Sequence, residues 1–212
     1  MKDNQLKQIQ WYPGHMFKSF REIKENIKLM DIVLILLDAR IPYSSMNPEI
    51  LKVIGDKPAI LLFNKMDLAD NNALKTWINH YEEQGFVCLE IDARSGKNVN
   101  KIKDLSNEVL SAQIERRKNR GLKEKDLRTM ILGIPNVGKS TLINRMANRR
   151  STKVGNTPGV TKAQQWIKLG NGFDLLDTPG VLWPKFEDPK VGYHLAITGA
   201  IKDKILPEDD VC

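Results

Sequence analysis

The segment from Gly133 to Ser140 carries the strongest chemical pattern in the chain. Its sequence, Gly-Ile-Pro-Asn-Val-Gly-Lys-Ser, fits the phosphate-binding pattern Gly-x4-Gly-Lys-Ser. Glycine lets the backbone bend so that successive N–H groups turn inward and hold phosphate oxygens, and the positive end of the following helix adds to them. We expect Lys139 to bridge the β- and γ-phosphates of a nucleotide and Ser140 to bind Mg²⁺. The predicted phosphate contacts come from Asn136, Val137, Gly138, Lys139, Ser140 and Thr141.

A second phosphate-linked motif, Asp177-Thr178-Pro179-Gly180, follows an apolar strand at a suitable distance beyond the glycine loop. We expect Asp177 to hold Mg²⁺ through water and the N–H of Gly180 to sense the γ-phosphate. The segment 155–161 between the two motifs contains two threonines, one of which would complete the Mg²⁺ shell. We favour Thr161, with Thr157 as the alternative.

A base-binding motif, Asn64-Lys65-Met66-Asp67, follows another apolar strand. The Asp67 carboxylate can accept hydrogen bonds from N1–H and the exocyclic amine of guanine, whereas adenine presents an acceptor at that ring nitrogen. A site built for one hydrogen-bonding pattern rejects the other strongly. We expect Asn64 to bond the imidazole edge of the base and the stem of Lys65 to lie against the ring face.

The loop Asp92-Ala93-Arg94-Ser95-Gly96-Lys97 follows the next strand. It is similar to the loop, usually written Ser-Ala-Lys, whose backbone N–H meets the guanine carbonyl oxygen. Asp92 and Arg94 replace its first and third residues, but the backbone of Ala93 can still serve. Ala93 therefore joins the predicted base site.

Strands that alternate with helices must position these motifs. Short apolar runs predict strands, and amphipathic stretches predict helices around 17–30, 73–84, 99–117 and 193–201. The predicted strands are 32–38, 59–63, 87–91, 129–132, 165–169 and 173–176. This order predicts an α/β fold with a doubly wound, mostly parallel sheet, in which ligands bind at the carboxyl ends of the strands.

Composition narrows the kind of protein further. The chain has 212 residues, a formal net charge of +7 and no apolar run of the roughly 18 residues needed to span a membrane. We expect a cytoplasmic monomer without a membrane partner. The basic charge suits phosphate-rich polymers, and the densest basic stretch, residues 115–125, is either a solvated helix end or an RNA-facing surface.

The motifs run in an unusual order, because the base-binding segments precede the phosphate loop. With this order, the chain resembles the circularly permuted GTPases of the YlqF/YawG family over nearly its whole length. The strings that carry the resemblance are 10–16 (Gln-Trp-Tyr-Pro-Gly-His-Met), 38–42 (Asp-Ala-Arg-Ile-Pro), 133–144 and 177–186. The resemblance implies a GTPase that acts in late assembly of the large ribosomal subunit, with rRNA and ribosomal protein as partners.

The resemblance also suggests a domain division. Residues 1–30 would form an N-terminal segment with an amphipathic helix, and 31–202 the permuted GTPase domain. Residues 203–212 would be the stub of a helical C-terminal region that family members possess and this chain lacks.

Catalysis requires a group that places water, and the residue after Gly180 is Val181, not glutamine. We therefore expect slow hydrolysis until a partner binds. The resemblance implies that His15, in the Pro-Gly-His segment, is the catalytic candidate; a neutral imidazole can hold or polarise water. It also implies that Asn136 helps to hold K⁺. An RNA-binding scaffold with little catalysis is the alternative, and an ATPase or kinase is disfavoured by Asp67.

Overall fold

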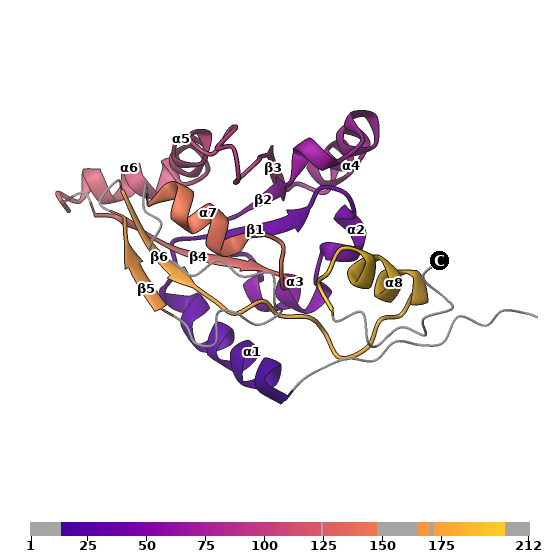
Figure 1. The fold of residues 1–212 in the computed structure, drawn as a ribbon. Coiled ribbons are helices and arrows are strands. Elements are labelled where there is room, and N and C mark those ends of the chain that lie inside the picture. Colours follow the sequence, from indigo (N-terminus) through magenta and orange to yellow (C-terminus); the bar gives the residue numbers. More distant parts are fainter. Residues whose placement is uncertain (1–13, 124, 148–164, 170–171, 202–212) are drawn as a thin grey trace, which may run out of the picture.

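The computed structural model describes residues 14–123, 125–147, 165–169 and 172–201 of the chain. Figure 1 shows a twisted central sheet with helices on both of its faces. The α/β fold with a mostly parallel sheet, predicted from the alternation of apolar runs and amphipathic stretches, is confirmed.

The described strands form one six-stranded sheet in the order β3-β2-β1-β4-β6-β5. Neighbouring strands are parallel except for the edge strand β5, which is antiparallel to β6. Every residue of the central strand β1 is buried, as expected of a parallel strand covered on both faces. The strands are β1 Ile32–Asp38, β2 Ala59–Asn64, β3 Val87–Glu90, β4 Leu127–Gly133, β5 Gln165–Lys168 and β6 Phe173–Asp177.

The helices cover the two faces of the sheet and give two apolar clusters (Figure 1). Side chains of α5 and α7 pack with Leu34 and Leu36 on one face, and side chains of α1, α3 and α4 pack with Ile35 and Leu37 on the other. The α-helices are α1 Gly14–Asn26, α2 Pro42–Ser45, α3 Pro48–Ile54, α4 Asn71–Glu83, α5 Lys101–Val109, α6 Ser111–Asn119, α7 Lys139–Met146 and α8 Pro189–Ile197. Two short 3-10 helices are η1 Ile27–Leu29 and η2 Met66–Leu68.

Three details differ from the prediction. The single helical stretch at 99–117 is two helices, α5 and α6, which meet at the buried Leu110. The last helix begins earlier than predicted, because Asp188 caps it and Pro189 occupies its first turn. The helices α2 and α3 were not foreseen, since each is too short to show a clear apolar period and each starts at a proline.

The N-terminal helix α1 packs against the sheet rather than standing apart from it. Ile23 of α1 and Ile27 of η1 belong to the same buried cluster as Val33 and Ile35 of β1. The predicted division of the chain at residues 30 and 202 stays a prediction, and residues 203–212 lie outside the described part of the structure.

Candidate nucleotide-binding site

The predicted site residues meet at one edge of the sheet because four parallel strands end there. The register pairs Asp38 of β1 with Asn64 of β2, Leu36 with Gly133 of β4, and Ile131 with Asp177 of β6. The base-binding motif, the glycine loop and the Asp-x-x-Gly motif therefore start from β2, β4 and β6, with only β1 between the first two. This is the edge at which doubly wound sheets bind ligands.

The glycine loop turns tightly between β4 and α7, and Gly138 is essential to that turn. Gly138 has φ +105°, and a Cβ atom built on it would lie 2.4 Å from Nδ2 of Asn64. Asn136 also has a positive φ, of 56°. A side chain at 138 would have to displace the Asn64 amide, which two hydrogen bonds hold in place, so the loop backbone and the base-binding motif are packed directly against each other.

Lys139 is a buried cation at the first position of α7. Only 7% of its surface is exposed, and its Nζ donates to the carbonyl oxygens of Gly133 (3.0 Å) and Ile134 (2.9 Å). Burial lowers the pKa of Lys139 to about 8, an effect that the nearby Asp177 carboxylate opposes. An ammonium group whose charge is not fully balanced favours the binding of negatively charged phosphate oxygens beside it.

Asn64 joins the two loops on either side of it. Its Nδ2 donates to the carbonyl oxygen of Val137 (2.8 Å), and its Oδ1 accepts from the backbone N–H of Ala93 (2.9 Å). In this structure the Ala93 N–H thus faces Asn64 rather than open space. The predicted contacts of Asn64 and Ala93 with the base stay predictions, and both residues lie where the base loops converge.

Lys65 is tied to a buried carboxylate that the sequence did not mark as a site residue. Its Nζ donates to Oδ2 of Asp38 (2.8 Å) and to the carbonyl oxygen of Asn136 in the glycine loop (3.0 Å). Asp38 also accepts from Nε and Nη2 of Arg40, at 2.8 and 2.7 Å. Burial alone would raise the pKa of Asp38, but the bonds from Arg40 and Lys65 outweigh it and hold this pKa below its usual value.

The role of Asp38 leaves a weak trace in the sequence, a carboxylate that ends an otherwise apolar strand. The pairing with Lys65 depends on which strands are neighbours, and no spacing along the chain reports that. The network extends to the base site, because Asp67 contributes to raising the pKa of Arg40 after the larger contribution from the Asp38 hydrogen bond. Asp67 itself is exposed at the start of η2, where its carboxylate can accept from a guanine.

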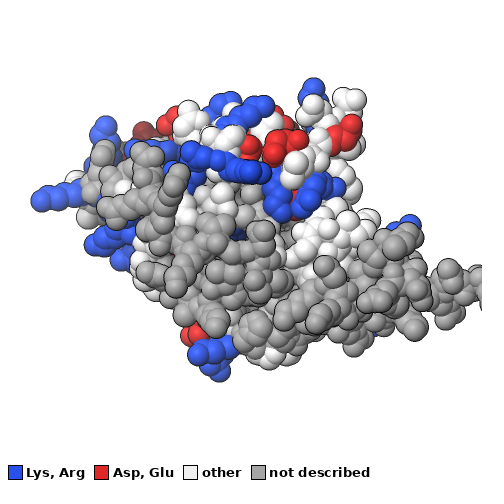
Figure 2. All heavy atoms as spheres, viewed as in Figure 1, with Lys and Arg blue, Asp and Glu red and all other residues white. Residues whose placement is uncertain are grey.

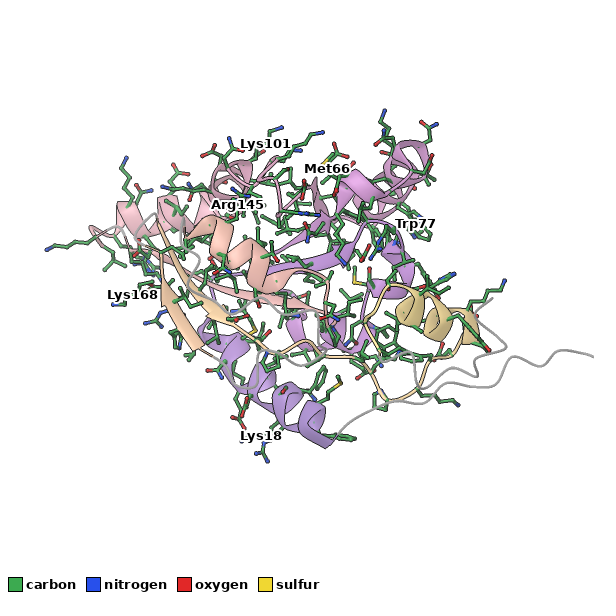
Figure 3. All side chains as sticks on the ribbon, in the orientation of Figure 1. Lys18, Met66, Trp77, Lys101, Arg145 and Lys168 are labelled. Atoms are coloured by element: carbon green, nitrogen blue, oxygen red, sulfur yellow. The ribbon has the colours of Figure 1, made fainter. Side chains whose placement is uncertain are left out.

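Arg145 of α7 is a second residue that sequence reasoning missed. Its Nε donates to the carbonyl oxygen of Ala93 (3.4 Å), and its Nη2 donates to that of Arg94. Figure 3 shows Arg145 reaching from α7 toward the loop that follows β3. Arg145 therefore braces the Ala93 loop from the helix that starts at the phosphate loop.

The Asp-x-x-Gly segment packs closely on the glycine loop. The hydroxyl of Thr178 donates to the carbonyl oxygen of Ile131 (2.7 Å), and the N–H of Val181 donates to the carbonyl oxygen of Gly133 (3.2 Å). A Cβ atom on Gly180 would lie 2.6 Å from backbone atoms of Pro135. The side chain of Val181 is fully buried in the apolar cluster on one face of the sheet.

Of the candidates for Mg²⁺ binding, two can be placed and the two threonines cannot. Ser140 lies in the first turn of α7 beside Lys139, and the buried Asp177 ends β6. A hydroxyl and a carboxylate are ligands that suit Mg²⁺, so the residues present fit the ion. Thr161 and Thr157 lie outside the described residues.

The remaining predicted residues have mixed outcomes. His15 lies in the first turn of α1, and its side chain is outside the described part. The Asn136 side chain donates from Nδ2 to the carbonyl oxygen of Gly199 after α8 (2.7 Å), so the glycine loop contacts the end of that helix. Thr141 follows Ser140 in α7 and is half-buried.

These features define a class of protein. A glycine loop with a buried lysine lies between a parallel strand and a helix, and the Asn-Lys-x-Asp motif follows β2, which β1 separates from β4 and which comes earlier in the chain. The molecule is a P-loop GTPase whose domain is circularly permuted.

Comparison with known proteins gives the family. A family model described as "50S ribosome-binding GTPase" matches residues 128–206. Ribosome biogenesis GTPase A from Priestia megaterium is 55% identical over 204 residues, which cover 96% of this chain and 71% of that protein. A protein of the same name from Bacillus pumilus is 53% identical, with 96% and 72% covered. The chain belongs to the ribosome biogenesis GTPase A family.

A solved structure agrees with this assignment. The crystal structure of GNP-bound YlqF from T. maritima matches with a TM-score of 0.64 and 26% identity, over 92% of this chain and 71% of that chain. The predicted family, fold class and GTPase activity are thereby confirmed. Within the described residues, no helix has the length and apolar composition that crossing a membrane requires.

Proposed function

We propose that this protein is a GTP-dependent switch in the assembly of the large ribosomal subunit, with slow hydrolysis of its own. The observation that carries the proposal is the junction of the two loops, where Asn64 bonds the phosphate loop at Val137 and the base loop at Ala93. This junction favours a nucleotide that engages both loops at once. The family to which the chain belongs supports the ribosomal role.

The nucleotide would lie across this junction. The guanine would bond Asp67 and the Asn64–Ala93 edge, with the stem of Lys65 against the ring face. The backbone of residues 136–141 would hold the α- and β-phosphates, and Lys139 would bridge to the γ-phosphate. We propose that Ser140, Thr161 and Asp177 hold Mg²⁺, which when bound neutralises charge on the β- and γ-phosphate oxygens.

Slow intrinsic hydrolysis is supported by Val181. Its side chain is buried, and its backbone N–H is bonded to Gly133, so the position that often supplies a water-orienting glutamine supplies nothing here. We propose His15, at the start of α1, as the residue that places water. We also propose that K⁺ binds at Asn136, where it would supply positive charge near the phosphates.

A basic surface on α6 supports the proposal of a ribosomal partner. Helix α6 buries none of its residues and ends in a basic turn. Four cations lie at the end of α6 and just after it: Arg116, Arg117, Lys118 and Arg120. None of the four forms an ion pair with an acidic residue in the described ranges. Figure 2 shows Lys and Arg side chains gathered at the end of the molecule where α6 projects. Such a surface suits the phosphate backbone of rRNA.

Hydrolysis measured under four conditions tests the proposal. GTP turnover of the wild type and of His15→Ala is measured in K⁺ and Mg²⁺, with and without purified large ribosomal subunits. We expect the subunits to stimulate the wild type, and His15→Ala to lose most of that stimulation without losing GTP affinity. Equal slow rates in all four conditions would contradict the switch and favour a scaffold.

Three comparisons sharpen the same experiment. Competition by ATP as effective as by GTP would contradict the guanine assignment. Equal rates in Na⁺ and K⁺ buffers would remove the potassium proposal. A variant with Arg116, Arg117, Lys118 and Arg120 changed to Glu should bind subunits more weakly, especially at raised salt, and should hydrolyse GTP alone at the wild-type rate.

A further inference from the structure

Asn47 is a buried polar residue that lies outside all of the nucleotide-binding motifs. Only 1% of its surface is exposed, and it precedes α3 in the segment after β1. Its side chain makes two hydrogen bonds of opposite sense. Oδ1 accepts from the N–H of Glu49 (3.0 Å) and caps α3, while Nδ2 donates to the carbonyl oxygen of Val181 (3.2 Å).

The first bond is a common structural feature, but the second is not. An N-cap needs only an acceptor oxygen, and serine or aspartate would serve as well as asparagine. The amide nitrogen is needed only because a carbonyl oxygen faces it across the fold. The choice of asparagine is therefore explained by Val181 rather than by α3.

Both backbone polar groups of Val181 are hydrogen-bonded. Its N–H donates to the carbonyl oxygen of Gly133, and its own carbonyl oxygen accepts from Asn47. Its side chain is buried in the cluster that includes Ile50 of α3. The residue just before it, Gly180, consequently has little freedom to move.

In the proposed nucleotide pose, Gly180 lies at the γ-phosphate end of the glycine loop. Nζ of Lys139 bonds the Ile134 carbonyl oxygen, and a Cβ atom on Gly180 would lie 3.0 Å from the carbonyl carbon of the same residue. Gly180 thus lies beside the lysine that would bridge the β- and γ-phosphates. A shift of Val181 would move the N–H of Gly180 relative to that point.

We propose that Asn47 is a positioning residue for γ-phosphate recognition, which fixes Val181 and through it the N–H of Gly180. The inference rests on the proposed GTP switch and adds the residue that makes it respond to the third phosphate. In this proposal Asn47 acts through Val181 and not by contact with the nucleotide. Its loss should weaken the response to GTP and leave GDP binding unchanged.

Two substitutions separate the bond to Val181 from the cap of α3. Asn47→Ser and Asn47→Asp both keep an acceptor for the N–H of Glu49. Ionised aspartate has no donor for Val181, and the shorter serine side chain should not reach the Val181 carbonyl oxygen while it caps α3. Asp70→Ala is the matched control, because Asp70 caps α4 through Asn72 and Ala73 and has no bond to the glycine loop. It removes a helix cap without touching Val181.

GTP and GDP affinities and single-turnover hydrolysis are measured for these variants and the wild type. For Asn47→Ser and Asn47→Asp we expect about five- to tenfold weaker GTP binding and slower hydrolysis, the effect of one lost hydrogen bond at a buried carbonyl. GDP affinity should stay within about twofold of the wild type. Asp70→Ala should lower the melting temperature and leave the ratio of GTP to GDP affinity unchanged.

Other outcomes are equally informative. If GTP and GDP affinities fall together, Asn47 supports only the fold and the inference is wrong. A GTP effect in Asn47→Asp alone would assign the change to the new carboxylate charge, which also overturns it. A wild type that binds GTP no differently from GDP and does not hydrolyse it would instead contradict the proposed switch itself.

Discussion

The base half and the phosphate half of the site are built in different ways. In the base half, from β1 to β3, polar side chains make the connections: Asp38 bonds the side chains of Arg40 and Lys65, and Asn64 bonds the backbone at Val137 and Ala93. In the phosphate half, Gly133 and Gly180 pack against backbone, and the Lys139 ammonium group donates to two carbonyl oxygens, with the Asp177 carboxylate nearby.

The difference concerns where charge is balanced. Asp38 has two cationic partners within hydrogen-bonding distance, so the base half is electrostatically satisfied without ligand. Lys139 is desolvated, and burial has lowered its pKa to about 8. The base half is thus prebuilt, whereas the phosphate half should change most in its electrostatics when a nucleotide binds.

The largest effect is expected from a substitution that disrupts the contact between the base half and the phosphate half. Gly138→Ala would place a Cβ atom on Asn64 at a positive φ, so it should abolish measurable GTP binding and cost about 2–4 kcal/mol of unfolding free energy. Gly85→Ala is the control, because Gly85 also has a positive φ but open space around it. It should cost stability only. Nucleotide titration and urea unfolding of both variants check this, and normal GTP binding by Gly138→Ala would refute the close packing.

The next effect tests the base half alone. Asp67→Asn replaces an acceptor with a mixed donor and acceptor, so GTP affinity should fall by about 100-fold or more while XTP affinity rises. Asp67 is exposed, so the melting temperature should hardly change. Competition binding with both nucleotides provides the measurement. Unchanged preference for GTP would show that another group selects the base.

A smaller effect tests the prebuilt charge network. Asp38→Asn leaves Arg40 and Lys65 facing a neutral amide, which should cost about 2–4 kcal/mol at pH 7 by urea unfolding. Glu49→Gln, which removes the exposed pair with Lys52, should change little.

The same variant has a pH signature. The pKa of Asp38 is lowered in the folded protein, so its contribution is present above the unfolded value of about 3.9 and is lost as pH falls through the folded value. Wild type and Asp38→Asn should therefore converge in stability below about pH 4. A difference that persists at acid pH would mean that shape, not charge, holds the network.

The smallest effect sharpens the electrostatic contrast. The phosphates of a bound nucleotide should raise the pKa of Lys139 from about 8. Nucleotide binding above this pH should therefore be accompanied by protonation of Lys139, and GDP affinity should fall about tenfold between about pH 7 and 9. Calorimetry of GDP binding in buffers of different ionisation enthalpy measures the uptake. Lys139→Arg is the control, since arginine stays charged at these pH values. Equal uptake by both proteins would assign the proton to another group.

Much of this molecule follows from local sequence. Buried parallel strands appear as continuous apolar runs, as 32–38 does, and a glycine loop before a helix has a fixed spacing because its backbone must close on phosphate. The motif order alone indicated the permutation. Short helices such as α2 and α3 escaped prediction because four to seven residues cannot show a helical period.

The contacts that join the motifs were decided only by the tertiary structure. Asp38 meets Lys65 because β1 and β2 are neighbours, Arg145 reaches Ala93 across the sheet edge, and Asn47 meets Val181 across 134 positions of chain. The sequence determined which residue types end each strand and hence the chemistry available. Which of those ends lie within hydrogen-bonding distance depends on strand order and helix packing. A hydrogen bond requires its two atoms to lie within a few ångströms of each other in space, and the separation of two residues along the chain does not predict that distance.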